Sequence, residues 1–131
     1  GKYFFLSNFY ELPIAYNGIS YLNNEAAFQA QKTLDNEMRK KFSNLSPSDA
    51  KRMGRHVKLR ADWEQVKDQI MYEIVKTKFT PPSCSYLNLM ATGDEPLEEG
   101  NTWGDREWGT VNGVGKNKLG KILMRVREEL K

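Results

Sequence analysis

The chain has 131 residues, of which 39% are hydrophobic, and it carries a formal net charge of +3. This length and composition predict one globular domain over residues 1–131 with a modest core, and leave no room for a second domain. Because 17 acidic residues are interleaved with the basic ones, charge alone does not indicate a nucleic-acid partner.

A β hairpin and a short helix are predicted near the N-terminus. Asn17-Gly18, a pair that favours a tight hairpin turn, lies between two β-favouring stretches within residues 13–21. Over residues 24–34 the pattern becomes helical, with Asn24 as the expected N-cap. Glu25 falls in the first turn, where the helix dipole favours a carboxylate.

Two further helices are predicted in the middle of the chain. Ser46-Pro47-Ser48-Asp49 combines a capping hydroxyl, a proline at the first helical position and a first-turn carboxylate, which predicts a helix of about two turns toward Gly54. Asp62 is the expected cap of the longest helix, and Pro81-Pro82 ends it. Its buried face should consist of residues that recur with helical periodicity: Trp63, Val66, Ile70, Met71, Ile74, Val75, Thr77 and Phe79.

The last third of the chain is predicted to hold a short apolar turn and one amphipathic helix. The turn covers residues 86–90 and leads into a loop at residues 92–96. The helix begins at about Asn117 and should bury Leu119, Ile122, Leu123, Val126 and Leu130. These elements predict an α+β fold, a compact and mainly helical single domain with a small antiparallel sheet.

The cysteine and histidine content restricts the chemistry. Cys84 is the only cysteine, which excludes an internal disulfide, and His56 is the only histidine, so no cluster has zinc-site spacing. No metal and no cofactor is expected. No apolar run approaches the ~20 residues of a membrane span and no signal-peptide pattern is visible, which predicts a cytoplasmic protein without a membrane partner.

The region between Trp103 and Gly120 carries the strongest functional signal. Trp103 and Trp108 flank the carboxylate of Asp105, and a Gly113-x-Gly115 turn precedes a helix N-terminus, where backbone amides favour an anion. Aromatic faces beside an anion cradle favour a nucleotide-like ligand, and Asp105 would then stabilise positive charge on a sugar. Each part also has an ordinary interpretation: a tight turn, core tryptophans and a loop aspartate that accepts backbone hydrogen bonds.

A mixed stripe on the first helix is a second candidate. Glu25, Phe28, Gln29 and Lys32 are spaced i, i+3, i+4 and i+7, so they share one helix face. Glutamate and lysine are rarely buried unless paired, so this stripe could line a cleft with the carboxylate as acid or base. The alternative is a solvated face with an intrahelical contact.

The densest basic stretch could hold a phosphate. It comprises Lys51, Arg52, Arg55, His56, Lys58 and Arg60. Guanidinium groups clamp phosphate oxygens well. An ordinary solvated helix and loop surface explains the stretch equally well.

Six blocks occur in order along nearly the whole chain: Phe5-Leu6-Ser7-Asn8-Phe9-Tyr10, Glu25-x-x-Phe28-Gln29-Ala30-Gln31-Lys32, Ser46-Pro47…Ala50-Lys51…Gly54-Arg55, Arg60-x-Asp62-Trp63, Thr92-Gly93-Asp94 and Trp108-Gly109…Asn112-Gly113-x-Gly115-x-Asn117-x-Leu119-Gly120. In this order and spacing they closely resemble the NADAR family, also called YbiA-like proteins. Many members have Glu-His-Tyr-Phe-Gln where this chain has Glu25-Ala26-Ala27-Phe28-Gln29. A histidine that serves substrate choice or proton transfer there has no counterpart here.

The resemblance implies an α+β enzyme that hydrolyses an N-glycosidic bond between ribose and a base-like nitrogen. It implies two substrate classes, ADP-ribose attached to guanine bases and phosphorylated ribosylamino intermediates of riboflavin synthesis. The expected partner is therefore a small ribosyl phosphate or an ADP-ribosylated nucleic acid, and no protein partner is indicated. The residues implied as catalytic are Glu25, Lys32 and Asp105; those implied as substrate-binding are Ser7, Asn8, Phe9, Phe28, Gln29, Arg55, Trp103, Trp108, Gly109, Gly113, Gly115 and Asn117.

Physical roles can be assigned to several of these residues. Arg55 and the amides around Gly115 would hold phosphate, a tryptophan and Phe9 would enclose the base, and Glu25 or Asp105 would stabilise charge at the anomeric carbon. If Lys32 is desolvated beside Phe28, the pKa of its amine falls toward ~7–8. It could then protonate the leaving nitrogen or attack an opened sugar. The competing assignment makes Glu25 essential, with Lys32 only paired to it.

Two other classes of function remain open. A binding module would recognise ADP-ribose or a related nucleotide in the same pocket without cleaving it. A nucleic-acid binder would use the basic stretch and show a steep dependence of affinity on salt.

Overall fold

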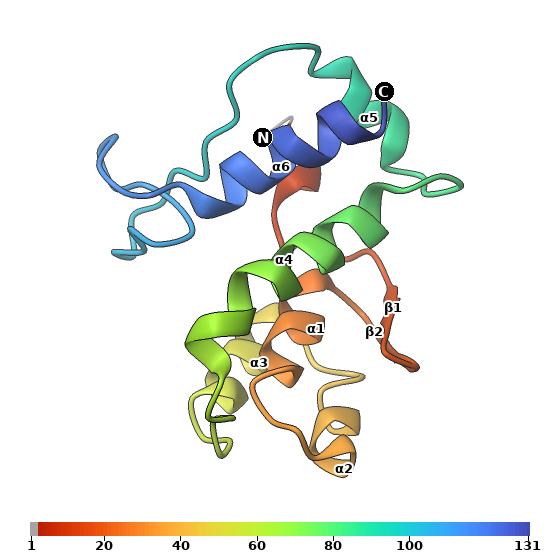
Figure 1. Ribbon diagram of the computed structural model, residues 1–131, viewed down its shortest axis with the longest axis vertical. Helices are drawn as coiled ribbons and strands as arrows, with labels where there is room; N and C mark the ends of the chain where they lie inside the picture. Colours follow the sequence, from red (N-terminus) through yellow and green to blue (C-terminus); the bar gives the residue numbers. More distant parts are fainter. Residues whose placement is uncertain (1–2) are drawn as a thin grey trace. The chain divides into compact units, whose positions relative to one another are not determined.

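The computed structural model describes residues 3–131 and divides into two units, Gly1–Lys78 and Phe79–Lys131 (Figure 1). The first unit contains a short 3-10 helix η1 (Phe4–Leu6), the hairpin, three helices and nearly all of the longest helix. The second contains two helices and the long segment between them. The α+β class predicted from the sequence is confirmed.

The predicted hairpin is present. Strands β1 (Ile14–Tyr16) and β2 (Ile19–Tyr21) pair antiparallel, with Ile14 opposite Tyr21. The turn residues Asn17 and Gly18 have φ values of 49° and 81°. A two-residue turn with positive φ at both central positions matches the twist of the strands, which explains the Asn-Gly pair.

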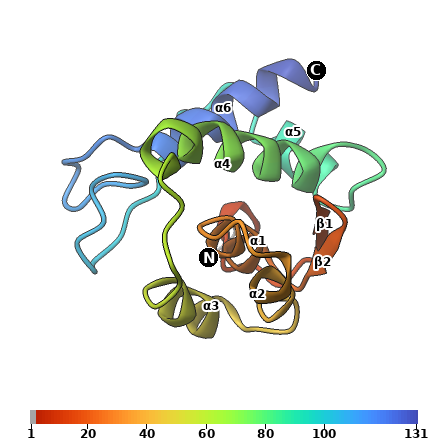
Figure 2. The ribbon, with the colours of Figure 1, turned by 60° about the horizontal axis from the view of Figure 1, so that its bottom comes forward.

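Helix α1 (Asn24–Ala30) forms the centre of the first unit, and all seven of its residues are buried. It packs against both strands, α2 (Asn36–Lys40) and α3 (Pro47–Gly54), which surround it in Figure 2. The expected N-cap is wrong by one residue: the side chain of Asn23 accepts the N–H of Ala26 at 2.8 Å. The helix also ends four residues before the predicted Leu34, and α2 was not predicted.

Helix α3 begins as predicted. Ser46 is the N-cap and its hydroxyl accepts the N–H of Asp49 at 3.2 Å, with Pro47 in the first turn. Its last residue, Gly54, lies directly against α1. A Cβ built on Gly54 would fall 2.0 Å from Oε1 of Gln29, so only glycine permits this approach.

Helix α4 (Trp63–Phe79) ends before Pro81-Pro82 as predicted. Most of the expected core face is buried, but Val66 is only half-buried and Thr77 is exposed. Asp62 directly precedes the helix, at the predicted cap position. The backbone carbonyl of Asp62 accepts N–H groups of Gln65 and Val66, while its carboxylate pairs with Arg60.

The second unit contains α5 (Tyr86–Ala91) and α6 (Lys118–Glu129). Leu89 and Leu97 are buried together with Leu119, Leu123 and Val126 of α6, while Ile122 and Leu130 are half-buried. Over residues 3–131, the helices are all too short or too polar to span a bilayer.

Candidate functional site

The polar stripe predicted on α1 is buried. Glu25 is 8% exposed, Gln29 is 6% exposed, and Phe28 is buried beside them. Gln29 Nε2 donates a hydrogen bond to Glu25 Oε2 at 3.3 Å. The alternative of a solvated face is therefore wrong for these three residues, although its intrahelical contact is present.

The segment Ser7-Asn8-Phe9 is held against the start of α1. The backbone N–H of Glu25 donates to the carbonyl oxygen of Asn8 at 3.0 Å, and Asn24 Nδ2 donates to Asn8 Oδ1 at 3.4 Å. Asn8 Nδ2 donates in turn to Met71 Sδ of α4 at 3.4 Å. Asn8 thus links two helices and places this predicted binding segment beside Glu25.

Lys32 lies just beyond α1 among several charges. Burial lowers the pKa of its amine, the carboxylate of Glu25 raises it, and the positive charges of Arg55, Lys51 and Lys67 lower it further. The direction agrees with the sequence hypothesis. Lys32 and the three cations that act on it outnumber the one carboxylate, and this surplus of positive charge suits a phosphate group.

Two of these cations are available to a ligand. Among residues 3–131, neither the amine of Lys32 nor the guanidinium of Arg55 forms a hydrogen bond or ion pair with another side chain. Arg55 is the exposed C-cap of α3. Lys51, one turn before it, holds its amine 5.9 Å from the ring centre of Phe9. Phe9 and Arg55, both predicted as binding residues, are thereby placed near Lys32 and Glu25.

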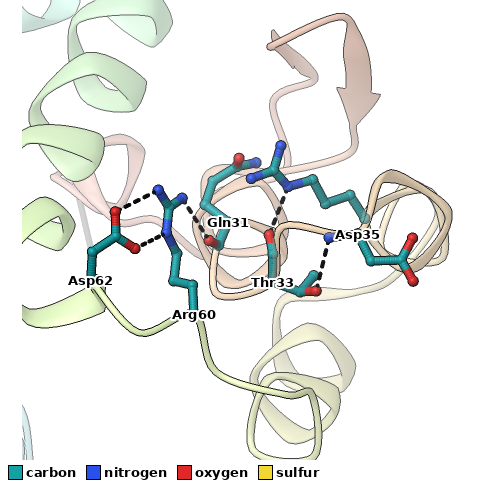
Figure 3. Close-up of polar contacts among 6 residues, drawn as sticks. Gln31, Thr33, Asp35, Arg60 and Asp62 are labelled. Atoms are coloured by element: carbon teal, nitrogen blue, oxygen red, sulfur yellow. Dashed lines mark hydrogen bonds and ion pairs between the residues drawn. The ribbon is translucent and has the colours of Figure 1, made fainter.

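Other arginines of the basic stretch form hydrogen bonds and ion pairs within the fold. Arg60 Nε and Nη2 donate to the carboxylate of Asp62 at 2.6 and 3.1 Å, and Nη1 donates to the carbonyl oxygen of Gln31 at 3.4 Å (Figure 3). Its backbone N–H donates to the carbonyl oxygen of Lys32 at 2.8 Å. Arg52 pairs with Asp49. The stretch is therefore not one open basic face.

The other side of Lys32 is fixed in the same way. Arg39 Nε donates to the carbonyl oxygen of Thr33 at 2.9 Å, and Thr33 Oγ1 accepts the N–H of Asp35 at 3.1 Å (Figure 3). Backbone carbonyls on both sides of Lys32 thus receive guanidinium hydrogen bonds. These hydrogen bonds fix the backbone on both sides of Lys32 and so restrict where its amine can lie.

Three neighbours of the site were not among the sequence candidates. The ring of Trp63 contacts Phe28 at a centroid distance of 5.1 Å. Lys67 lies one turn further along α4 and Gly54 lies against Gln29. The spacing of Trp63 and Lys67, i and i+4, places them on one helix face, but nothing local shows that this face meets α1.

In the second unit, Asp105 has a structural role. Its Oδ1 accepts the N–H groups of Glu107 and Trp108 at 3.0 and 2.9 Å. Asn101 Nδ2 donates to the carbonyl oxygen of Asp105, and Asn101 Oδ1 accepts the backbone N–H of Asp105. This geometry corresponds to the loop-aspartate interpretation of the sequence.

The glycines before α6 allow close packing of the loop. A Cβ on Gly109 would fall 2.1 Å from the carbonyl oxygen of Glu99, and one on Gly115 would fall 2.4 Å from that of Gly109. Gly113 follows Asn112 in a tight turn, with φ values of 79° and 53°. These contacts explain the glycines by packing and turn geometry.

The start of α6 is occupied by the chain itself. The N–H groups of Lys118 and Leu119 donate to the carbonyl oxygens of Glu107 and Trp108. Asn117 accepts the N–H of Glu99 at 2.9 Å and donates to the carbonyl oxygen of Leu97 at 2.9 Å. The two helical amides are therefore unavailable for the predicted anion cradle.

The two tryptophans of this loop differ in exposure. Trp103 is 62% exposed, whereas Trp108 is half-buried and its ring lies 5.4 Å from the amine of Lys118. An exposed indole is accessible for stacking on a base. The roles predicted for both residues stay predictions.

The described part of the chain offers no group of three or more His, Cys, Asp or Glu side chains suited to a metal ion. Cys84 is an exposed free thiol, and His56 is exposed as well.

Known proteins resemble this chain over almost its whole length. The NADAR domain model matches residues 1–131. The N-glycosidase YbiA of Escherichia coli is 41% identical over 128 residues, which cover 95% of this chain and 79% of that protein. An NMR structure of the E. coli protein YbiA matches with a TM-score of 0.81 and 40% identity, and the match covers 96% of this chain and 77% of that one.

A more distant relative carries a different name. A riboflavin biosynthesis protein of Vibrio vulnificus is 37% identical over 130 residues, covering 96% of this chain but 35% of that protein. The extent of these matches, together with the fold, establishes that the chain belongs to the NADAR domain family.

Proposed function

We propose that this chain hydrolyses the N-glycosyl bond of a ribosyl phosphate compound at the site formed by Glu25, Lys32 and Arg55. The reaction class follows from the family, because relatives 41% identical over most of the chain are named N-glycosidase. The chain is accordingly a hydrolase that acts on N-glycosyl bonds. The observation that carries the site is the buried carboxylate of Glu25 within a surplus of positive charge.

Glu25 is the group that serves the anomeric carbon. Cleavage of a ribosyl C1′–N bond develops positive charge on the sugar, and a preorganised carboxylate stabilises that charge. Its position is set by the amide of Gln29 and by the backbone bond to Asn8. Asp105 was the other candidate, but its Oδ1 accepts two backbone N–H groups of its own loop. The catalytic carboxylate is therefore that of Glu25.

Lys32 serves the leaving nitrogen. The water oxygen bonds to C1′ as the C1′–N bond breaks, the leaving nitrogen takes a proton from the Lys32 ammonium, and the carboxylate of Glu25 accepts the proton from water. The products are a sugar with a hydroxyl at C1′ and a free base or amine. A lysine with a lowered pKa donates a proton near neutral pH more readily than an ordinary one.

Arg55 and Lys51 hold the phosphate of the substrate. Lys51 lies in the second half of α3, Arg55 is its C-cap, and both act on Lys32 electrostatically. The guanidinium of Arg55 is exposed and can form two parallel hydrogen bonds with phosphate oxygens. Phe9, below the amine of Lys51, offers an aromatic face near the same anion.

The substrate is ADP-ribose linked to guanine or a phosphorylated ribosylamino pyrimidine. Both contain a ribose, a phosphate that Arg55 and Lys51 can bind, and an N-linked heterocycle that Glu25 and Lys32 can release. The second class is favoured by the names of two relatives, the riboflavin biosynthesis proteins of Vibrio vulnificus and Zea mays.

A hydrolysis assay read by mass spectrometry tests the proposal. Guanine-linked ADP-ribosyl DNA, a ribosylamino pyrimidine phosphate and NAD are offered in parallel to the unmodified chain, Glu25→Gln and Glu37→Gln. Glu37 is an exposed carboxylate on α2 that pairs with Lys40, which makes it a matched control. We expect release of ADP-ribose or ribose phosphate from one substrate, abolished only by Glu25→Gln. Retention of a ligand with no turnover would instead identify a binding module.

A further inference from the structure

The side chain of Gln29 is held in one orientation from two sides. Its Nε2 donates to Glu25 Oε2, which fixes which end of the amide faces the carboxylate. The amide oxygen of Gln29 lies against Gly54: a Cβ added to Gly54 would fall 2.0 Å from Gln29 Oε1 and 2.9 Å from Gln29 Cδ. Gln29 therefore occupies space that every other residue type at position 54 would take.

The oxygen of that amide has no partner. Gln29 Oε1 is buried and accepts no hydrogen bond within the described part of the chain. A buried acceptor without a donor costs about 1–3 kcal/mol, so an apolar side chain of the same shape would serve folding better. Such an oxygen marks a place where water or a bound molecule supplies the donor.

Gly54 also connects this contact to the anion site. Arg55 follows it directly as the C-cap of α3, and α3 packs against α1. The close approach at Gly54 thus sets the spacing between the guanidinium and the carboxylate. No left-handed φ is involved at this glycine, so the requirement is one of space alone.

We propose that Gln29, seated against Gly54, is the positioning residue that orients the Glu25 carboxylate for attack on the sugar. This inference rests on the proposed function. Gln29 acts through Glu25, because its N–H holds the carboxylate in one rotamer. Glu25 interacts electrostatically with Lys32, on which Lys51, Arg55 and Lys67 also act, and these four cations are unchanged in the variants below.

Gln29→Met is the direct test because methionine keeps the length of the side chain and removes both polar ends. We expect kcat/KM to fall about 10- to 100-fold, the size of effect that small misplacements of catalytic groups produce. The acidic limb of the pH profile should move to higher pH, because a carboxylate without an N–H donor holds its proton more tightly. The Tm should stay the same or rise, since the partnerless oxygen is gone. A lowered Tm with unchanged kcat/KM would overturn the proposal.

Gly54→Ala tests the support from α3. The atoms in the way belong to a flexible side chain, so the fold should survive while Gln29 is displaced. We expect a similar loss of kcat/KM, and no further loss when Gly54→Ala is added to Gln29→Met. Gly100→Ala is the matched control, because its Cβ meets nothing within 4 Å. Losses that simply multiply in the double variant would contradict positioning through Gln29.

A measurement independent of turnover separates this inference from the proposed function. The side-chain NH2 signals of Gln29, followed by NMR across pH, should titrate with Glu25 in the unmodified chain and stay constant in Glu25→Gln and in Gly54→Ala. Absence of hydrolysis by the unmodified chain would overturn the proposed function, while this titration would still report the contact. Signals that never titrate would overturn the positioning role even if the chain is active.

Discussion

At Lys32, burial and like charge act in the same direction. Removal from water disfavours the ammonium form, and Arg55, Lys51 and Lys67 repel it, so only Glu25 supports the charge. The sequence predicted this lysine as a candidate because it shares a helix face with Phe28. It did not predict the like charges, since α3 and α4 bring them together only in the folded chain.

Replacing Lys32 should separate function from stability. The folded chain binds the Lys32 proton more weakly than the unfolded chain, so the ammonium is destabilising below the lowered pKa and stability rises as pH passes through it. We expect Lys32→Met to raise the Tm by a few degrees at neutral pH and to abolish hydrolysis. Thermal unfolding and the hydrolysis assay on the same samples would check both.

Lys32→Arg keeps the charge and removes both the proton donor and the nucleophile. We expect a loss of kcat of about 100-fold or more, in the range of general acid–base contributions, with binding of phosphate retained. The unmodified chain should lose activity as pH rises through the lowered pKa of Lys32. Full activity of the arginine variant would exclude Lys32 as acid and as nucleophile alike.

The ion pair of Arg60 with Asp62 supports the segment before Lys32. The guanidinium hydrogen bond holds the pKa of Asp62 below 3.8. A depressed carboxyl pKa adds stability above the unfolded value, and that stability is lost as pH falls through the folded value. We expect Asp62→Asn to lower the Tm at pH 7 and to leave it nearly unchanged near pH 2. An equal Tm loss at both pH values would contradict this assignment.

At the scale of elements, the sequence predicted the turns and helix starts that contacts between nearby residues determine. Asn17-Gly18 sets its own turn, and Ser46-Pro47 starts α3 through contacts within one helical turn. The short helices η1 and α2 were missed because three or five residues carry too little periodicity. The role of Asn117, by contrast, depends on backbone groups 18 and 20 residues away.

Asn117 is expected to hold the long loop to the start of α6. Its side chain makes hydrogen bonds to the backbone of Glu99 and Leu97. We expect Asn117→Ala to destabilise the fold by about 2–3 kcal/mol, because it breaks two hydrogen bonds and leaves backbone groups unpaired. Chemical denaturation measures the change, with Asn88→Ala on the exposed face of α5 as control. Equal stability of the two variants would contradict the role.

At the scale of the whole molecule, the prediction of one domain stays a proposal. The family model and the YbiA structure both match across the two units, which supports a single cooperative fold. We expect thermal unfolding to show one transition, coincident by far-ultraviolet circular dichroism and by tryptophan fluorescence. The tryptophans report both units, since Trp63 lies in the first and Trp103 and Trp108 lie in the second. Two separated transitions would overturn the proposal.

Six sequence blocks spread over the chain indicated the family, but they predicted the functional site only in part. The blocks indicated which residues to consider, whereas burial and hydrogen bonding distinguish Glu25 from Asp105. Both are carboxylates near aromatic residues in the sequence. Only the folded chain shows that one is held beside a buried amide and the other closes a turn.

The catalytic role of Glu25 is tested most directly by the single-turnover rate of N-glycosyl bond cleavage in Glu25→Gln and Glu37→Gln, measured together with the affinity of each variant for the substrate. We expect Glu25→Gln to bind the substrate and to cleave it about 10³-fold more slowly, the scale on which electrostatic catalysis operates, while Glu37→Gln matches the unmodified chain. Cleavage by Glu25→Gln at the unmodified rate would contradict the assignment of the buried carboxylate as the catalytic centre.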